Sequence, residues 1–181
     1  FTWVTEFLSA NVVEEVQIDG VVHSVTHVND EAFVTLNEPL SQGEMFNATI
    51  LYSAAPPTGG FFSGITTTYD SWGKWVTWTL SEPFAARDWF PVKQVLEDKA
   101  DSVWVFLTTD EDEMAGSNGL LTDVVSLPDN KVRYEWKSNY PIAYYLISFA
   151  VADYRDLSFK AALSGEGDSV LVQNYIYDTD E

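Results

Sequence analysis

The segment TLSEPFAARDWFP (79–91) groups the residues of this sequence whose types could do chemistry. It sets the carboxylates of Glu82 and Asp88 and the guanidinium of Arg87 among aromatic residues and prolines. A carboxylate in such a place can bind a cation, such as an amine, or accept a hydrogen bond from a backbone N–H. The segment is too polar for a core strand and too aromatic for an ordinary loop. It is therefore interpreted as either a structural corner or a binding site.

Other arrangements of catalytic residues are missing from the sequence. His23 and His27 lie in VVHSVTHV, a strand-like stretch in which about 3.3 Å per residue places them roughly 13 Å apart, too far to share one zinc ion. The chain has no cysteine, and so no thiolate ligand or thiol nucleophile. The acidic run Asp110–Glu113 lacks the alternating ligands of a calcium loop and is interpreted as a solvated loop. We expect no metal site, no cofactor and no catalytic residue in this chain.

The charge balance narrows the classes of partner. Nine basic residues against 28 acidic ones give a formal net charge of -19 over 181 residues. Such a surface repels nucleic acid and anionic lipid, so neither is expected as a partner. Two roles for the charge stay open, namely solubility and the attraction of cations or amine-bearing ligands. No apolar run approaches the roughly 18 residues of a membrane-spanning helix, so no membrane span is expected.

The elements that must position these residues are strands. Alternation of apolar and polar residues predicts strands at 46–52, 102–109, 131–137 and 170–177. The almost wholly apolar AYYLISFAVA (143–152) predicts a central strand buried on both faces, and only 91–99 predicts a short helix. Many short strands between Gly-, Pro- and Asn-containing turns indicate an all-β fold, an antiparallel β-sandwich with very little helix. We expect one domain over 1–177 and the start of a linker at 178–181, in a chain cut from a longer protein.

Several segments resemble those of aminopeptidase N-like zinc metallopeptidases, in that family's order and approximate spacing. They are GGFFSG, WTLSEPFAARDWFPVK, DKADSVWVFLTT with AGSNGLL, and YPIAYYLISFAVADY. The resemblance implies a saddle-like N-terminal β-sandwich domain, here without its first strands, that packs on a catalytic domain of the same polypeptide. That missing domain would hold the zinc, so this chain alone is not expected to be an enzyme although its parent protein is. The form SEPFAARDWFP is most similar to secreted or periplasmic bacterial members.

The same resemblance implies two substrate-binding residues. Glu82 stands where the family has a residue that binds the free α-amine at the N-terminus of a peptide substrate. Leu80 stands where the family commonly has Gln, a polar residue lining the pocket for the first substrate side chain, so this change bears on substrate preference. A purely structural role for Glu82 also stays open. In that role it is a carboxylate at the end of a strand that accepts a hydrogen bond from a backbone N–H.

Neighbouring residues are expected to support Glu82. Arg87 is expected to tie the loop down by pairing with Asp88 or with a nearby carbonyl. Pro83 and Pro91 fix φ and so stiffen the segment. Trp89 and Phe90 are expected to pack beneath it, and Val92, which replaces the family's usual Cys, is expected to affect packing only.

Two alternatives belong to a different class of function. With seven Trp and nine Tyr, the chain could be a stand-alone module that binds carbohydrate, because aromatic rings supply stacking platforms. It could also be a cell-surface module that binds protein. Against the first alternative, Trp75, Trp78, Trp104 and Trp136 lie in strand patterns that core packing would explain. If the chain is one domain of a peptidase, we expect it to expose an apolar patch that the catalytic domain covers.

Overall fold

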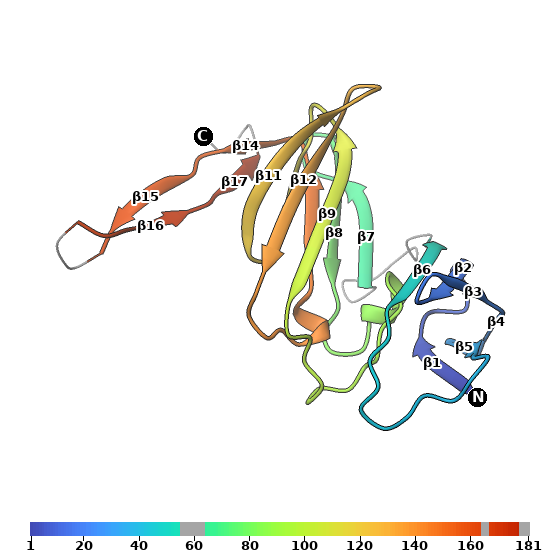
Figure 1. Cartoon of the computed structure of the whole chain (residues 1–181). Coiled ribbons are helices and arrows are strands. Elements are labelled where there is room, and N and C mark those ends of the chain that lie inside the picture. The colour runs from blue at the N-terminus through green and yellow to red at the C-terminus, as the bar shows by residue number, and fades with distance from the viewer. Residues whose placement is uncertain (55–63, 164–166, 178–181) are drawn as a thin grey trace. The chain divides into compact units, whose positions relative to one another are not determined.

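The computed structural model describes residues 1–54, 64–163 and 167–177, which form mainly antiparallel strands (Figure 1). The chain divides into two compact units. Unit 1 contains Phe1–Thr66, Thr79–Asp101 and Pro141–Ser148, and unit 2 contains Thr67–Trp78, Ser102–Tyr140 and Phe149–Glu181, each without the gaps just given. The all-β prediction is confirmed. The prediction of a single domain over 1–177 stays a prediction, and the linker predicted at 178–181 lies outside the described residues.

Unit 1 contains a small sandwich of two three-stranded antiparallel sheets, with strand orders β1-β5-β4 and β3-β2-β6. The strands are β1 (Thr2–Glu6), β2 (Val12–Ile18), β3 (Val21–His23), β4 (Val25–Val28), β5 (Glu31–Thr35) and β6 (Ala48–Ser53). Alternate side chains of a strand point to one face. Val16 and Ile18 of β2 therefore meet Val34 of β5 and the following Leu36 in a buried core.

Unit 2 is organised around a second sandwich. One sheet has the order β10-β13-β8-β7, and the other has the order β11-β12-β9. The strands are β7 (Gly64–Tyr69), β8 (Trp75–Leu80), β9 (Val103–Asp110), β10 (Met114–Ser117), β11 (Leu120–Leu127), β12 (Lys131–Ser138) and β13 (Phe149–Ala152). The first three residues of β7 and the last two of β8 belong to unit 1. Ala115 of β10 and Tyr134 and Trp136 of β12 share one buried core. The indole Nε1 of Trp136 donates a hydrogen bond to the carbonyl of Ala115 at 2.9 Å, which joins the two sheets.

Two short ribbons follow this sandwich in the chain. β14 (Tyr154–Asp156) pairs with β17 (Tyr175–Tyr177), and β15 (Phe159–Ala162) pairs with β16 (Ser169–Val172). The ribbon β15–β16 extends away from the sheets of unit 2 (Figure 1). Its exposed apolar side chains include Phe159, Val170 and Leu171. A two-stranded ribbon is only marginally stable by itself, so these side chains are suited to contact with another domain.

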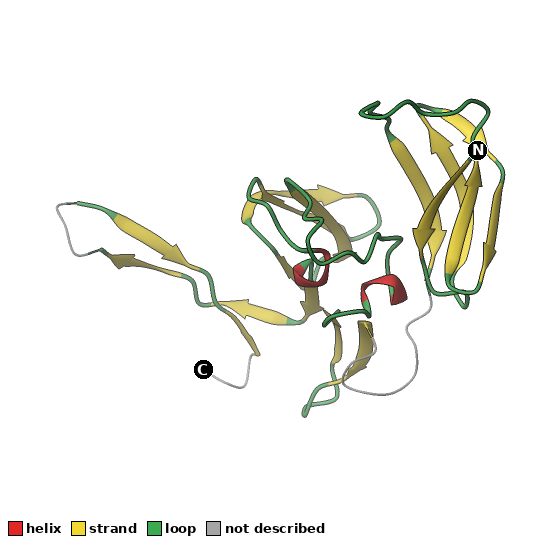
Figure 2. Ribbon diagram, turned by 90° about the horizontal axis from the view of Figure 1, so that it is seen from below, coloured by secondary structure: helices red, strands yellow, loops and turns green. Residues whose placement is uncertain are grey.

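Three sequence predictions about helix and strand are wrong. Segment 170–177 is not one strand, because residues 173 and 174 separate β16, which pairs with β15, from β17, which pairs with β14. Segment 91–99 is not helical, because the N–H and C=O of Val92 both bond to the backbone of Glu6, at 2.9 and 2.8 Å, in an extended bridge. Segment 143–152 is not one strand. It contains the helical turn η2 (Tyr144–Leu146), and only its last four residues form β13, which does lie centrally in its sheet. Figure 2 shows η2 together with η1 (Ala86–Asp88). In the parts of the chain that the structure describes, no helix is long and apolar enough to cross a membrane.

The prediction that four tryptophans lie in the core is correct only in part. Trp136 is buried and Trp78 is half-buried, whereas Trp75 is 53% exposed and Trp104 is 61% exposed. The reason is the two-residue period of a strand. Val105 and Leu107 of β9 pack against the core of unit 2, so Trp104 emerges on the opposite face. An apolar type of side chain does not by itself decide which face is covered.

Candidate functional site

Glu82 lies at the start of a loop, residues 81–92, which we call the Glu82 loop. The loop follows β8, whose last residue, Leu80, is half-buried. Ser81 is buried, and Glu82, Pro83 and Phe84 are all exposed. No hydrogen bond or ion pair reaches the Glu82 carboxylate from any residue that the structure describes. Among residues 1–54, 64–163 and 167–177, nothing therefore occupies this carboxylate.

The base of the loop is held by hydrogen bonds within the loop. The backbone N–H of Ala85 bonds to the carbonyl of Ser81 at 3.0 Å, and the indole Nε1 of Trp89 donates to Ser81 Oγ at 3.0 Å. Trp89 also packs on Phe90, with ring centroids 4.4 Å apart. Ser81 is only 2% exposed, so its hydroxyl is a fixed anchor immediately before Glu82.

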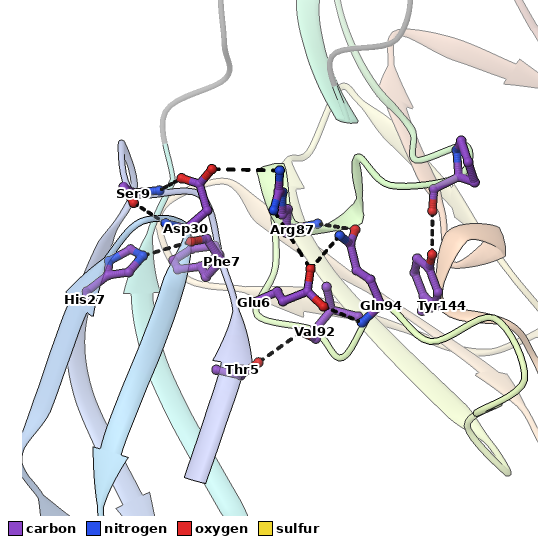
Figure 3. Close-up of polar contacts among 11 residues, drawn as sticks. Thr5, Glu6, Phe7, Ser9, His27, Asp30, Arg87, Val92, Gln94 and Tyr144 are labelled. Carbon is purple, nitrogen blue, oxygen red and sulfur yellow. Dashed lines mark hydrogen bonds and ion pairs between the residues drawn. The ribbon is translucent and has the colours of Figure 1, made fainter. Parts of the chain in front are cut away.

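The other side of Glu82 is held by Tyr144 of η2. The buried phenol of Tyr144 donates a hydrogen bond to the carbonyl of Pro83 at 2.6 Å (Figure 3). Tyr144 also forms a small buried cluster with Ala86 and Val92. Because Ser81 and Pro83 are both anchored, the backbone on each side of Glu82 is fixed.

The partners of Arg87 differ from those predicted. Its guanidinium lies 3.9 Å from the carboxylate of Glu6 and 3.8 Å from that of Asp30, rather than in a pair with Asp88 (Figure 3). All three side chains are about one-third exposed, so these ion pairs contribute little stability. The correction has a physical cause: Arg87 and Asp88 are adjacent in η1, and residues one position apart on a helical turn do not face each other. The structural role predicted for Arg87 stays a prediction.

Two carboxylates near the loop have shifted pKa values for opposite reasons. The backbone N–H of Ser9 lies 2.8 Å from Asp30 Oδ1 and holds the pKa of Asp30 below its usual value, and the charge of Arg87 lowers it further. Burial raises the pKa of Asp88, and the charge of Arg87 offsets part of this rise. The carbonyl of Asp88 accepts a hydrogen bond from Asn11 Nδ2 at 3.0 Å. Asp88 thus helps to connect the loop to the beginning of the chain.

The C-terminal part of the loop is attached to β1. Besides the bridge between Glu6 and Val92, Thr5 Oγ1 donates to the carbonyl of Val92 at 3.2 Å. The amide Nε2 of Gln94 donates to the Glu6 carboxylate at 2.9 Å, and the backbone N–H of Leu8 bonds to the carbonyl of Arg87 at 2.9 Å. These contacts hold residues 87–94 along the first strand (Figure 3).

Gly64 supports the loop from β7, and the sequence did not identify this role. It has a φ of +68°, and a Cβ atom built on it would lie 2.4 Å from the carbonyl oxygen of Ala85 and 2.6 Å from Cβ of Asp88. Only glycine permits this close approach without strain. Gly64 is the last residue of GGFFSG, and the first five residues of that motif lie outside the described residues.

Four further supporting residues were also missed by sequence reasoning. They are Glu6, Asn11, Gln94 and Tyr144. Glu6 and Asn11 are distant in sequence from the loop, and their residue types are ordinary for a strand and a turn. Tyr144 had a usable signal, because it belongs to the motif YPIAYYLISFAVADY that was recognised but assigned no contact.

The described residues, 1–54, 64–163 and 167–177, do not suit a zinc ion. They contain no group of three or more His, Cys, Asp or Glu side chains placed to hold a metal. A ring nitrogen of His23 lies 2.9 Å from the carbonyl oxygen of Thr35, and one of His27 lies 2.9 Å from that of Phe7. Both histidines therefore bond to the backbone within unit 1.

Comparison of the sequence with family models identifies the domain to which this loop belongs. The model of the Peptidase M1 N-terminal domain matches residues 4–146. The chain belongs to this family. The matched range of this M1 N-terminal domain includes Glu82 and its supporting residues from Glu6 to Tyr144. No curated protein sequence gives a significant match to the chain.

Solved structures with a similar fold include zinc metallopeptidases of the M1 family. The M1 zinc metallopeptidase from Deinococcus radiodurans is 21% identical with a TM-score of 0.76, over 95% of this chain and 38% of that one. A mutant of the same enzyme bound to a Tyr-Ser-Ala substrate gives the same identity and TM-score, over 95% of this chain and 39% of the other. A two-domain M1 zinc metallopeptidase mutant bound to L-arginine is 20% identical with a TM-score of 0.77, over 96% and 39% of the two chains. This M1 N-terminal domain thus spans well under half the length of these structures.

Proposed function

We propose that this chain is the non-catalytic N-terminal domain of a zinc metallo-aminopeptidase. In this proposal it packs on the catalytic domain of the same polypeptide, which holds the zinc, and Glu82 binds the free α-amine of the peptide substrate. Family membership and the similarity to zinc metallopeptidases support the role of the domain. We also propose a secreted or periplasmic location for the parent protein, from the form of the segment 79–91 alone.

The observation that carries the proposal is the exposed carboxylate of Glu82, which has no partner among the described residues and lies between two anchored residues, Ser81 and Pro83. A peptide α-amine has a pKa near 8 and is largely cationic at neutral pH. Because the backbone on each side of Glu82 is anchored, binding of this ammonium group has to order only the side chain of Glu82 and not the loop. The resulting charge-assisted hydrogen bond contributes roughly 1.5–3 kcal/mol. Such a contact selects peptides with a free N-terminus.

Exposed apolar groups support packing on a second domain. Phe84 is 56% exposed two residues after Glu82, where it could contact a catalytic domain that receives the carboxylate. The ribbon β15–β16 presents further exposed apolar side chains, including Phe159 and Leu171. Half-buried Leu80, just before the loop, would then line the pocket for the first substrate side chain and favour apolar side chains there.

The test uses the parent enzyme with its catalytic domain. Glu82→Ala is expected to lower kcat/KM for peptides with a free N-terminus by roughly tenfold to a hundredfold. The kcat/KM of Glu82→Gln should lie between those of Glu82→Ala and wild type, because the amide keeps an acceptor oxygen. The matched control is Glu38→Ala, which removes an exposed carboxylate of unit 1 away from the loop and should leave kcat/KM unchanged. Wild type should strongly prefer a free amino end over an acetylated one, and Glu82→Ala should lose much of that preference. Equal discrimination by both proteins would show that the amine is bound elsewhere.

A further inference from the structure

The outer face of the sheet β11-β12-β9 presents aromatic side chains to solvent. In the register of this sheet, Trp104 lies opposite Lys137 and Phe106 lies opposite Glu135. The intervening residues of the same strands, such as Val105 and Trp136, belong to the core of unit 2. Trp104 is 61% exposed and Phe106 is 49% exposed, although both lie in the eight-residue strand β9 (Figure 1).

These aromatic rings are held in place by polar neighbours. The ammonium group of Lys137 lies 5.3 Å from the ring centroid of Trp104 and 5.4 Å from that of Phe106, which allows cation–π attraction to both. Trp104 Nε1 lies 3.4 Å from Oδ1 of Asn139. Trp104 and Phe106 are two residues apart on β9, so their side chains are roughly 6.6 Å apart along the strand on one face. The pair forms a pre-ordered platform, and a ligand would lose little entropy in ordering it.

A hollow adjoins this platform where β11 begins and β12 ends. It has a volume of about 650 Å³ and is lined by Gly119, Leu120, Lys137, Ser138, Asn139 and Tyr140. This volume lies within the range of small-ligand sites. The lining provides an ammonium group, a hydroxyl, an amide and a phenol next to apolar surface. Such a combination suits a ligand with apolar faces and many hydrogen-bonding groups at its edges.

The charges on this face cancel, because the cations Arg133 and Lys137 lie among two carboxylates, Glu135 and Asp123, which are opposite each other in the sheet register. The Glu135 carboxylate accepts a hydrogen bond from the Arg133 guanidinium at 2.6 Å and lies 3.7 Å from the ammonium group of Lys137. An anion would also be repelled by the chain's net charge of -19. Lys137 and Glu135 also disfavour a protein partner, because Lys and Glu are depleted at the centres of protein interfaces. The face is therefore complementary to a neutral, hydroxyl-rich ligand.

We propose that the outer face of β11-β12-β9 is a binding site for neutral carbohydrate. The C–H faces of sugar rings stack on the faces of Trp104 and Phe106 that Lys137 does not cover, and sugar hydroxyls bond to Lys137, Ser138 and Asn139 in the adjoining hollow. This site is separate from the Glu82 loop and does not depend on the peptidase proposal. It would give the chain a second function, attachment to polysaccharide.

Native affinity electrophoresis of the 181-residue chain tests the proposal. The probes are laminarin, hydroxyethyl cellulose and soluble starch, each cast in the gel. At least one polysaccharide should retard the wild-type chain, and Trp104→Ala should weaken that affinity by about tenfold, because the stacked ring no longer buries its area. Trp75→Ala is the matched control, since it removes a tryptophan that is similarly exposed on another sheet, and it should bind as wild type does. Urea unfolding checks that both variants are folded.

Three results would overturn the proposal. One is that none of the three polysaccharides retards the wild-type chain. Another is that Trp75→Ala weakens binding as much as Trp104→Ala does. The third comes from analytical ultracentrifugation without sugar: a concentration-dependent dimer that Trp104→Ala abolishes would show that the face binds a second copy of the chain instead.

Discussion

Replacing Gly64 by alanine tests whether close packing against β7 holds the Glu82 loop in place. A side chain on a residue with a φ of +68° by itself lowers the free energy of unfolding by about 1–2 kcal/mol. The new Cβ would also lie 2.4 Å from the carbonyl oxygen of Ala85, a backbone atom that cannot move unless the loop moves. Overpacking of this kind costs about 1–3 kcal/mol, so the total loss of stability should be about 2–5 kcal/mol.

Gly20→Ala is the control for this experiment. Gly20 is also in unit 1 and has a φ of +80°, but nothing lies within 4 Å of the position its Cβ would take. Its substitution should therefore cost only the conformational part, about 1–2 kcal/mol. The difference between the two variants isolates the contact between Gly64 and the loop.

The assay combines urea unfolding with amide hydrogen exchange. Urea midpoints measure the loss of stability, and exchange reports the loop locally through the N–H of Val92, which is bonded to Glu6. Gly64→Ala should speed exchange at Val92, and Gly20→Ala should not. Equal urea midpoints in the two variants, with unchanged exchange at Val92, would refute the claim that Gly64 positions the loop.

The remaining predictions concern tyrosines, with exposed Tyr140→Phe as the control for each. Tyr144→Phe should lower the free energy of unfolding by about 1 kcal/mol, because the carbonyl of Pro83 loses its hydrogen-bond donor. A urea midpoint equal to that of the control would contradict this. Burial raises the pKa of Tyr154 and Tyr175 to about 12 each. The unfolded state, with a tyrosine pKa near 10, therefore loses these protons first, and stability should fall as pH rises from about 10 towards 12. Urea titrations in this pH range should show a smaller loss of stability for Tyr154→Phe than for the control. An identical loss in both variants would count against burial of Tyr154 as the cause of the pH dependence.

The strands could be predicted from sequence because their signal is local. Lys131–Ser138 alternates strictly, and its buried residues are Val132, Tyr134 and Trp136, as the two-residue period requires. The same period placed Trp104 and Phe106 on one face of β9, but it could not tell which face a second sheet covers. Treating tryptophan as a core residue then gave the wrong face for Trp104.

The site could be predicted less completely. The segment 79–91 was identified from its own residues, and its loop does present Glu82 to solvent. Its supports could not be read from the sequence, because Thr5 lies 87 residues from Val92 and Glu6 lies 88 residues from Gln94. The same distant pairing explains the false helix at 91–99, since local propensity yields to the backbone bonds between Val92 and Glu6.

The attachment of the Glu82 loop to β1 has a consequence for the kinetics of folding. Contacts between residues 87 or 88 positions apart require closure of a long stretch of chain, so they form after the local hairpins. Interactions that are absent from the folding transition state change the unfolding rate and leave the folding rate almost unaltered. Changes at Thr5, Glu6 or Gln94 should therefore shorten the lifetime of the native state while the chain still folds at its normal speed. The residues that hold Glu82 in place would thus determine how long the site persists rather than how quickly it forms.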